Sequence, residues 1–237
     1  INQRWANIKK QNHVTEVVVN ATSDKNASIT GTGTYNPTEV DKVEINTTSE
    51  DGTKTDKYTV NLVRTKSTDT TLDELSVTGY TITPSYSDTV NTYNVVVPST
   101  ENSISVVATP HDPRTTAVVS GNTNSLETGN NEVIVTVTPE KGSSSERIIT
   151  INVKKQDGDA TLSSLTMTGA TFDFDKDTKV YDVTVPYTTD QTTISASPSK
   201  DTTTASGDTG LKTLTPGTNT FVINTKAEDE NITDSYT

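Results

Sequence analysis

Cysteine is absent from the 237 residues, and aromatic residues make up only 5% of them. Without cysteine there are no disulfide bonds, no thiolate metal site and no cysteine nucleophile. No apolar run approaches the roughly 18 residues that cross a bilayer as a helix, and no N-terminal signal pattern is present. The sequence therefore predicts no membrane insertion and no disulfide cross-links.

Basic residues are also scarce, since 19 Lys and Arg stand against 31 Asp and Glu, a formal charge of 19 − 31 = −12. This balance argues against nucleic acid as a partner, because such binding depends on neutralising phosphates with basic side chains. It argues equally against an anionic membrane surface. A cysteine-free, acidic chain rich in Thr and Asn is typical of bacterial extracellular proteins, so we predict a cell-surface or secreted location. The chain starts at Ile1 without a Met, and we expect it to be a piece of a longer protein.

Apolar residues make up only 29% of the chain, which together with the charge raises the possibility of disorder. Internal repeats argue for a folded array instead. Three landmarks recur in the same order at spacings of 88 to 90 residues, namely Thr71–Gly79 with Thr161–Gly169, Thr92–Pro98 with Val180–Pro186, and Thr128–Asn131 with Pro216–Asn219. The chain therefore contains the back part of one repeat, one whole repeat and most of a third.

Within each repeat, apolar residues alternate with polar ones, the period of a strand with one buried face. The clearest inward series are Tyr93, Val95 and Val97; Val133, Val135 and Val137; and Ile149, Ile151 and Val153. A kink is expected between Leu72 and Leu75 in the opening strand. Six or seven such strands in about 90 residues predict an all-β fold of tandem immunoglobulin-like antiparallel β-sandwiches arranged as an extended rod.

The same comparison predicts three segments: a partial sandwich over residues 1–66, a complete one over 67–156, and one over 157–237 that lacks its last strand. The polar joints at 66–70 and 156–160 are only a few residues long, and short joints restrict bending. Residues 1–12 do not fit the pattern. They are expected to form a short helix or a frayed remnant of an upstream region.

These landmarks resemble the bacterial cadherin-like β-sandwich domain, which occurs in tandem in surface-attached and secreted proteins, especially of Gram-positive bacteria. The resemblance rests on the Thr-Leu-x-x-Leu opening at Thr71 and Thr161, the Tyr-x-Val-x-Val-Pro at Tyr93, its counterpart at Tyr181, and the closing strand from Tyr58. The middle repeat departs from the pattern at Ile149, where a Tyr is usual. The resemblance implies a spacer or adhesive module without catalytic residues.

Catalysis has little support in the residues themselves. The two histidines are His13 and His111, and His111 lies in the turn-rich sequence Pro110-His111-Asp112-Pro113. An enzyme needs a poised acid, base or nucleophile, and no spacing fixes one here. We therefore predict a protein that is not an enzyme.

Calcium binding has more support in the sequence than catalysis, although the strand and repeat pattern does not require a cofactor. Asp173, Asp175 and Asp177 have the spacing that opens an EF-hand loop, but the glycine and the bidentate Glu of that loop are missing. Asp157 and Asp159 lie in a joint, the place where true cadherins hold calcium. Solvated turn acids are the alternative interpretation of both groups.

A glycan or protein ligand would need aromatic side chains that face solvent. Tyr80, Tyr86 and Tyr187 lie in or beside loops and are the candidates, with loop packing as the alternative. A covalent cross-link from a core Lys to an Asn or Asp side chain, found in some Gram-positive surface sandwiches, has little support because no Lys is placed clearly on an inward strand phase. Lys154, Lys155 and Arg147 are expected to protect a sheet edge by their charge.

Taken together, these features predict a non-catalytic structural spacer or adhesion stalk segment of a bacterial surface or extracellular protein. Its partners would be neighbouring domains of the same longer chain, and a cell-wall or host glycan or protein. Two alternatives stay open. One is an accessory glycan- or protein-binding module of an extracellular hydrolase, and the other is a fibre subunit that takes a strand from another copy.

Overall fold

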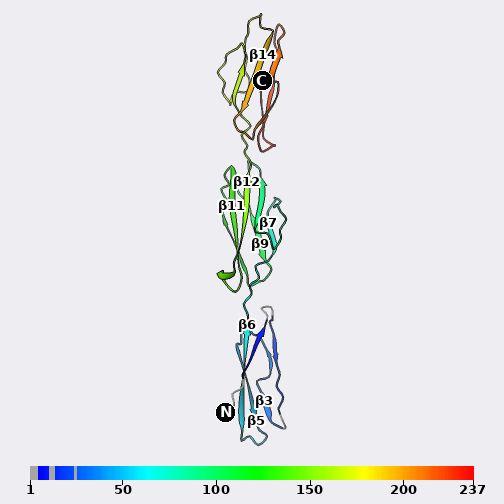
Figure 1. Ribbon diagram of the computed structural model, residues 1–237, viewed down its shortest axis with the longest axis vertical. Helices are drawn as coiled ribbons and strands as arrows, with labels where there is room; N and C mark the ends of the chain where they lie inside the picture. Colours follow the sequence, from blue (N-terminus) through cyan, green and yellow to red (C-terminus); the bar gives the residue numbers. More distant parts are fainter. Residues whose placement is uncertain (1–4, 11–13, 24–25) are drawn as a thin grey trace. The chain divides into compact units, whose positions relative to one another are not determined.

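The computed structural model describes residues 5–10, 14–23 and 26–237, and β-strands account for nearly all of its regular structure (Figure 1). In this part of the chain the one helical element is the 3-10 helix η1 (Ser143–Ser145), and no helix is long and apolar enough to cross a membrane. The predicted all-β class is confirmed. Contacts divide the chain into two compact units: residues 1–70, 111–116 and 138–146, and residues 71–110, 117–137 and 147–237.

The first segment builds two sheets around one apolar cluster. Its strands are β1 (Trp5–Lys10), β2 (Val17–Val19), β3 (Ser28–Thr30), β4 (Gly33–Tyr35), β5 (Lys42–Thr48) and β6 (Thr55–Arg64). The larger sheet has the order β1-β6-β5-β3, and β2 pairs with β4 in the smaller one. Inward residues of β2, β5 and β6 form the core, which consists of Val17, Val19, Val43, Ile45, Val60 and Leu62.

The expectation of a helix or frayed remnant at the N-terminus is wrong for Trp5–Lys10. These residues form β1, which runs parallel to β6 with Trp5 opposite Thr59 and Lys10 opposite Arg64. Because β5 pairs with only one edge of β6, the other edge offers unpaired backbone groups that a further strand can satisfy. The rest of residues 1–12 lies outside the described residues.

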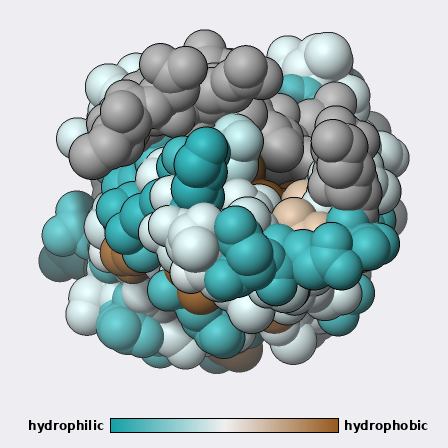
Figure 2. All heavy atoms as spheres, turned by 90° about the horizontal axis from the view of Figure 1, so that it is seen from below, coloured by the Kyte–Doolittle hydropathy of each residue, from teal (hydrophilic) through white to brown (hydrophobic). Residues whose placement is uncertain are grey.

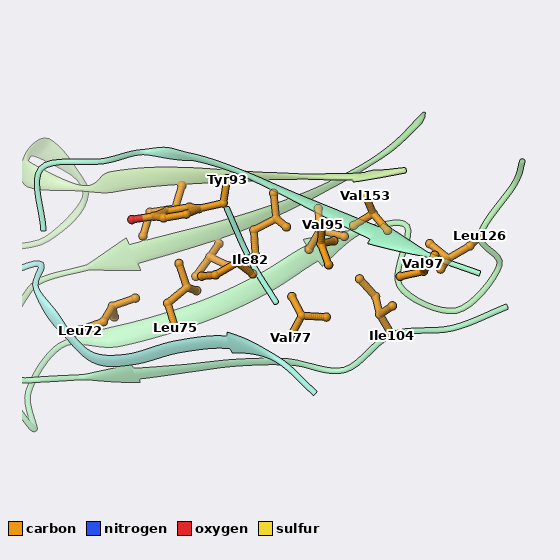
Figure 3. Packing of buried hydrophobic residues seen from close by; sticks show 14 of the residues in the cluster. Leu72, Leu75, Val77, Ile82, Tyr93, Val95, Val97, Ile104, Leu126 and Val153 are labelled. Atoms are coloured by element: carbon orange, nitrogen blue, oxygen red, sulfur yellow. The ribbon is translucent and has the colours of Figure 1, made fainter. Parts of the chain in front are cut away.

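The middle segment is a two-sheet sandwich with a continuous core. Its strands are β7 (Leu72–Val77), β8 (Thr92–Val97), β9 (Val106–Pro110), β10 (Thr116–Gly121), β11 (Gly129–Thr138) and β12 (Arg147–Lys155). One sheet has the order β10-β11-β12-β8, and the other pairs β7 with β9. Figure 3 shows Tyr93 and Val95 on one side of the core, with Leu72, Leu75 and Val77 on the other. The inward phase predicted for β8, β11 and β12 is confirmed, since its apolar positions are buried.

The third segment has a smaller core between two three-stranded sheets, ordered β13-β14-β16 and β15-β17-β18. Its strands are β13 (Leu162–Met167), β14 (Gln191–Pro198), β15 (Thr204–Gly207), β16 (Gly210–Thr213), β17 (Ile223–Lys226) and β18 (Thr233–Tyr236). The core consists of Leu162, Leu165, Ile194, Ile223 and Tyr236. Strand β18 pairs with β17 over its four residues, and the expectation that this segment lacks its last strand stays a prediction.

Local structure recurs at the spacing seen in the sequence. The Tyr93 hydroxyl accepts the N–H of Ser87 at 3.1 Å and donates to its carbonyl at 3.0 Å. Tyr181, 88 residues later, makes the same two bonds with Asp175, at 2.9 and 2.6 Å. The division into 1–66, 67–156 and 157–237 stays a prediction.

The kink expected in the opening strand is a β-bulge. Between Leu72 and Glu74 the register of β7 against β9 shifts, and β13 shifts between Leu162 and Ser164. A bulge inserts one extra residue, so Leu72 and Leu75 both point to the core although three positions separate them.

Two expectations about β12 are wrong. This strand is central in its sheet, so Arg147, Lys154 and Lys155 do not protect an edge. Lys155 is also a lysine on an inward phase, only 7% exposed, and its Nζ donates to Oδ1 of Asn102 at 2.8 Å and to the Leu126 carbonyl at 3.1 Å. These acceptors allow the charge to be buried.

Few apolar side chains face solvent. The face shown in Figure 2 carries mostly hydrophilic and intermediate residues, with hydrophobic ones in small separate patches. The large hydrophobic residues that are exposed in the described part are spread along the chain, namely Val18, Val63, Val96, Val118, Val119, Ile148, Val180, Tyr187 and Leu211. Such scattered residues are ordinary for a folded surface.

Gly121, at the end of β10, gives a first testable prediction. Its φ is +97°, and a Cβ there would lie 2.5 Å from the carbonyl oxygen of Glu132. We expect Gly121→Ala to lower the free energy of unfolding by about 2–5 kcal/mol, from left-handed strain plus the backbone clash. Gly129→Ala is the matched control, because φ is +92° there and no atom lies within 4 Å of the added Cβ. Urea unfolding of both variants checks this, and equal losses would contradict the clash.

Candidate functional site: two acidic clasps

The first of two similar clusters lies where β6 ends, and all its residues belong to the first compact unit. Glu140, in the loop between β11 and β12, accepts hydrogen bonds from both terminal nitrogens of Arg64, with Nη1 at 2.8 Å from Oε2. The same carboxylate accepts the backbone N–H of Ser67 at 3.0 Å, and the Lys141 N–H donates to the Ser67 carbonyl at 2.9 Å. We call this group (Arg64, Ser67, Glu140 and Lys141) the first clasp.

The second clasp consists of Lys154, Asp157, Glu228 and Asp229, which all belong to the second compact unit. Lys154 Nζ lies 2.5 Å from Oε1 of Glu228, and the Asp157 N–H donates to Oε2 at 2.9 Å. The Asp229 N–H donates to the Asp157 carbonyl at 2.9 Å. Each contact repeats one in the first clasp, with the basic and joint residues 90 positions on and the loop residues 88 positions on.

Asp229 distinguishes the second clasp from the first. Its side chain is buried, and Oδ2 accepts both the N–H of Ser99 at 2.8 Å and the Ser99 hydroxyl at 2.7 Å. The first clasp has the exposed Lys141 at this place. The second clasp therefore connects three stretches of chain: the end of β12, the loop after β8 and the loop between β17 and β18.

The clasps favour ionised carboxylates. Hydrogen bonds from Arg64 lower the pKa of Glu140 from 4.5 to about 2, against the opposing effect of burial. A hydrogen bond from Lys154 lowers the pKa of Glu228, and the Ser99 hydroxyl and N–H lower that of Asp229. At neutral pH both clasps are thus charged and hydrogen-bonded.

Neither predicted metal group converges on a common point. Asp157 accepts the N–H of Asp159 at 2.8 Å, and Asp159 accepts the N–H and hydroxyl of Thr161 at 2.8 and 2.6 Å. These are local turn bonds. Asp175 likewise accepts the N–H of Asp177 at 2.9 Å.

Asp173 is exposed, and Asp177 pairs with the neighbouring Lys176 at 2.8 Å. Over residues 5–10, 14–23 and 26–237, no three Asp, Glu, His or Cys side chains gather as a metal-binding group. Calcium binding by the acids at 157, 159, 173, 175 and 177 stays a prediction.

Calcium titration is the second test. We expect millimolar calcium to leave the melting temperature where equal magnesium leaves it, because the joint acids already accept protein hydrogen bonds. A ligand that binds only the folded state raises stability with its concentration. A saturable rise in melting temperature with calcium, lost in Asp159→Asn, would contradict this expectation. Differential scanning calorimetry makes the measurement.

The three candidate tyrosines have different surroundings. Tyr80 is half-buried and donates its hydroxyl to Glu101 at 2.6 Å, while Tyr86 is half-buried and accepts the N–H of Leu72 at 2.9 Å. Both pack against the middle core, as the alternative of loop packing predicts. Tyr187 is 97% exposed and belongs to the third segment. The structure therefore places no shared aromatic platform on these three residues.

His111 is exposed in the loop between β9 and β10. His13 lies outside the described residues. The residues that sequence reasoning missed are Glu140, Glu228 and Asp229. The signal for them was available, because the repeat alignment places Glu140 opposite Glu228 and Arg64 opposite Lys154.

Comparison with known proteins agrees with this fold. Residues 72–158, less than half of the chain, match the family model described as "Cadherin-like beta sandwich domain". Domains of this kind are typically non-catalytic and extracellular, and often bind calcium. No match was found among curated proteins.

Two solved structures illustrate the similarity. The Drosophila N-cadherin EC1-3 structure is 9% identical at a TM-score of 0.38, over 99% of this chain and 96% of that one. The protocadherin gamma B4 extracellular domain is 10% identical at a TM-score of 0.36, over 98% of this chain and 47% of that one. Similarity at these TM-scores is too low to carry a functional argument.

Proposed function

We propose, from the premise that residues 72–158 form a cadherin-like β-sandwich domain, that this chain is a non-catalytic structural spacer or adhesion stalk segment of a bacterial cell-surface or extracellular protein. The observation that carries the proposal is the repeated clasp. A short joint already restricts bending, and it bends least where its backbone groups have fixed partners. In both clasps one glutamate accepts a joint N–H and pairs with a basic residue in the last two positions of the preceding strand.

Burial strengthens the second clasp as a restraint. Asp229 is 1% exposed and holds the N–H and hydroxyl of Ser99, so bending of residues 156–160 would leave a buried carboxylate without its donors. A buried carboxylate that loses its hydrogen-bond donors destabilises the arrangement by about 1–3 kcal/mol. The function of such a spacer is mechanical. Each clasp restrains bending at a joint and so keeps neighbouring domains at a set distance.

The test uses the absence of cysteine, which lets two labels be placed without background. Spin labels at Val118→Cys and Leu211→Cys, both on exposed positions of the second compact unit, report the distance across the second clasp. We expect a narrow distance distribution, and a broad one after Glu228→Ala with Asp229→Ala. Glu230→Ala is the matched control, because Glu230 is exposed in the same loop and pairs with Lys226 at 2.8 Å. An unaltered protein as broad as the double variant would contradict the spacer proposal.

A second candidate is an accessory glycan- or protein-binding module of an extracellular hydrolase. Tyr187 favours it, since a tyrosine that is 97% exposed offers a ring face to a ligand. A glycan panel tests this, with binding expected to be lost in Tyr187→Ala and retained in Tyr80→Ala and Tyr86→Ala. The charge of −12 makes polyanionic partners such as nucleic acid unfavourable under either function.

A further inference from the structure

The second joint, residues 156–160, lies against the loop that follows β8. Ser99 of that loop donates its N–H and its hydroxyl to Oδ2 of Asp229, at 2.8 and 2.7 Å. A Cβ added to Gly158 of the joint would lie 2.7 Å from the Ser99 hydroxyl oxygen. The close approach of Ser99 therefore requires a glycine at this position. We call residues 98–102 the strap, because through Ser99 they contact both the joint and the second clasp.

The strap is fixed to the middle sandwich at its other end. Lys155, the last residue of β12, is only 7% exposed, and its Nζ donates to Oδ1 of Asn102 at 2.8 Å and to the Leu126 carbonyl at 3.1 Å. The Leu126 N–H in turn donates to the Asn102 carbonyl at 3.0 Å. The Tyr80 hydroxyl donates to Glu101 at 2.6 Å. The last two residues of the strap thus have partners in the middle sandwich.

Lys155 contributes most to this attachment, because it is buried and because the chain runs directly from it into the joint. The Gln156 N–H donates to the Val97 carbonyl at 3.0 Å, and its side-chain amide donates to the Glu228 carbonyl, also at 3.0 Å. A buried charge is stable only with its hydrogen-bond partners. Movement of the strap away from Lys155 is therefore unfavourable.

The repeat places other residues at three positions of this arrangement. They are Thr65 for Lys155, Thr68 for Gly158 and Lys141 for Asp229, at spacings of 90, 90 and 88 residues. Lys141 is exposed, and a lysine side chain cannot accept the two hydrogen bonds that Asp229 accepts. The sequence therefore provides for this contact at the second joint specifically.

We propose that Lys155 is a positioning residue, which fixes the strap to the middle sandwich so that Ser99 restrains the second joint. The packed core places Lys155, Lys155 places Asn102, and the strap then presents both donors of Ser99 to the buried carboxylate of Asp229. The consequence for the joint rests on the proposed spacer function. The placement of Ser99 by Lys155 can be measured without it.

The first test measures amide exchange by NMR in the full chain, as the rate at Ser99 relative to the rates in β11. We expect Lys155→Met, which keeps the length of the side chain but removes its donors, to raise this ratio by about tenfold or more, because the Ser99 N–H loses its acceptor when the strap moves. A general loss of stability would speed exchange in β11 and would not raise the ratio.

Asn102→Ala removes the acceptor on the strap while Lys155 keeps its charge, and it should raise the same ratio. Ser103→Ala is the matched control, because Ser103 is exposed beside the strap, and the ratio should not change. An unchanged ratio in Lys155→Met or in Asn102→Ala would overturn the proposal. So would an equal rise in Ser103→Ala.

The second test places the Lys155→Met change in the protein labelled at Val118→Cys and Leu211→Cys. We expect a broader distance distribution than in the labelled protein with Lys155 intact. Faster exchange at Ser99 with an unchanged narrow distribution would overturn the strap as a restraint on the joint and leave the spacer function standing. A distribution that is already broad with Lys155 intact would contradict the spacer function instead, and the exchange ratio would still decide whether Lys155 positions the strap.

Discussion

Replacing Tyr93 with alanine is expected to lower the free energy of unfolding by about 3–5 kcal/mol, the range for removing a large aromatic side chain from a core. Tyr93 has no exposed surface and lies in the middle core, where Figure 3 shows its ring above Leu72, Leu75 and Ile82. Its ring centroid is 6.2 Å from that of Tyr86. Alanine would lose these contacts and leave a cavity.

Tyr93→Phe separates the ring from the hydroxyl. That hydroxyl accepts the N–H of Ser87 at 3.1 Å and donates to the carbonyls of Ser87 and Val90, both at 3.0 Å. Phenylalanine would leave the Ser87 N–H without its acceptor, at a cost of about 1–3 kcal/mol, whereas both carbonyls keep Nη2 of Arg147 as a donor. Tyr93→Phe should therefore lower the free energy of unfolding less than Tyr93→Ala does. The difference between the two variants measures the contribution of the ring.

Tyr187→Ala is the control for both variants, because Tyr187 is 97% exposed. Surface substitutions of this kind stay within about 0.5 kcal/mol. Urea unfolding followed by circular dichroism measures all three proteins. A loss in Tyr187→Ala as large as that in Tyr93→Ala would contradict the burial of the Tyr93 ring as the cause.

The inward position of Tyr93 could be predicted from the sequence because strand periodicity is local. Alternation over Tyr93, Val95 and Val97 assigns one face to the core whatever the strand pairs with. The bulge at Leu72 was visible for the same reason, as a break of the period. The fold class could therefore be predicted from short stretches of sequence, because each of them shows the two-residue period of a strand.

Lys155 shows where this reasoning stops. It continues the inward series Ile149, Ile151 and Val153 at the same spacing, yet residue type argues for exposure because a lysine is seldom buried. Its burial depends on acceptors from Asn102 and Leu126, which are 53 and 29 residues away in the chain. No local pattern contains that information.

The clasps were missed for a related reason. Arg64 and Glu140 are 76 residues apart, and a single Glu in a loop has no periodicity to mark it. Only the superposition of one repeat on the next pairs Glu140 with Glu228 and so suggests a shared role. The acids chosen from sequence instead, such as Asp175 and Asp177, were chosen for close spacing on the chain, and in the structure Asp175 accepts the Asp177 N–H in a local turn bond.

Glu140→Gln is expected to destabilise the protein by about 1–2 kcal/mol at neutral pH. Glutamine keeps the shape and one oxygen for the Ser67 N–H, but it removes the charge that faces Arg64. The side chains of Glu140 and Arg64 are 17% and 12% exposed, so the pair is shielded but not dry. We therefore expect a smaller loss of stability than the lowered pKa of Glu140 alone implies, because solvent screens part of the attraction between the two side chains.

The effect depends on pH with a definite sign. The folded pKa of Glu140 is lowered from 4.5 to about 2, so the folded state releases this proton more readily than the unfolded state. Its contribution is complete above pH 4.5 and is lost as the pH falls toward 2. The stability difference between the wild-type protein and Glu140→Gln should therefore shrink over that interval and be smallest at its acid end.

Unfolding at a series of pH values measures this difference directly, since all other titrating groups are shared by the two proteins. Glu132→Gln is the control, because Glu132 is exposed on β11, and its difference from the wild-type protein should stay near zero throughout. A Glu140→Gln difference that is constant from neutral pH to the acid end would show that the carboxylate charge does not stabilise the first clasp. The carboxylate would then act through shape and hydrogen bonding alone, and the electrostatic account of the clasp would be wrong.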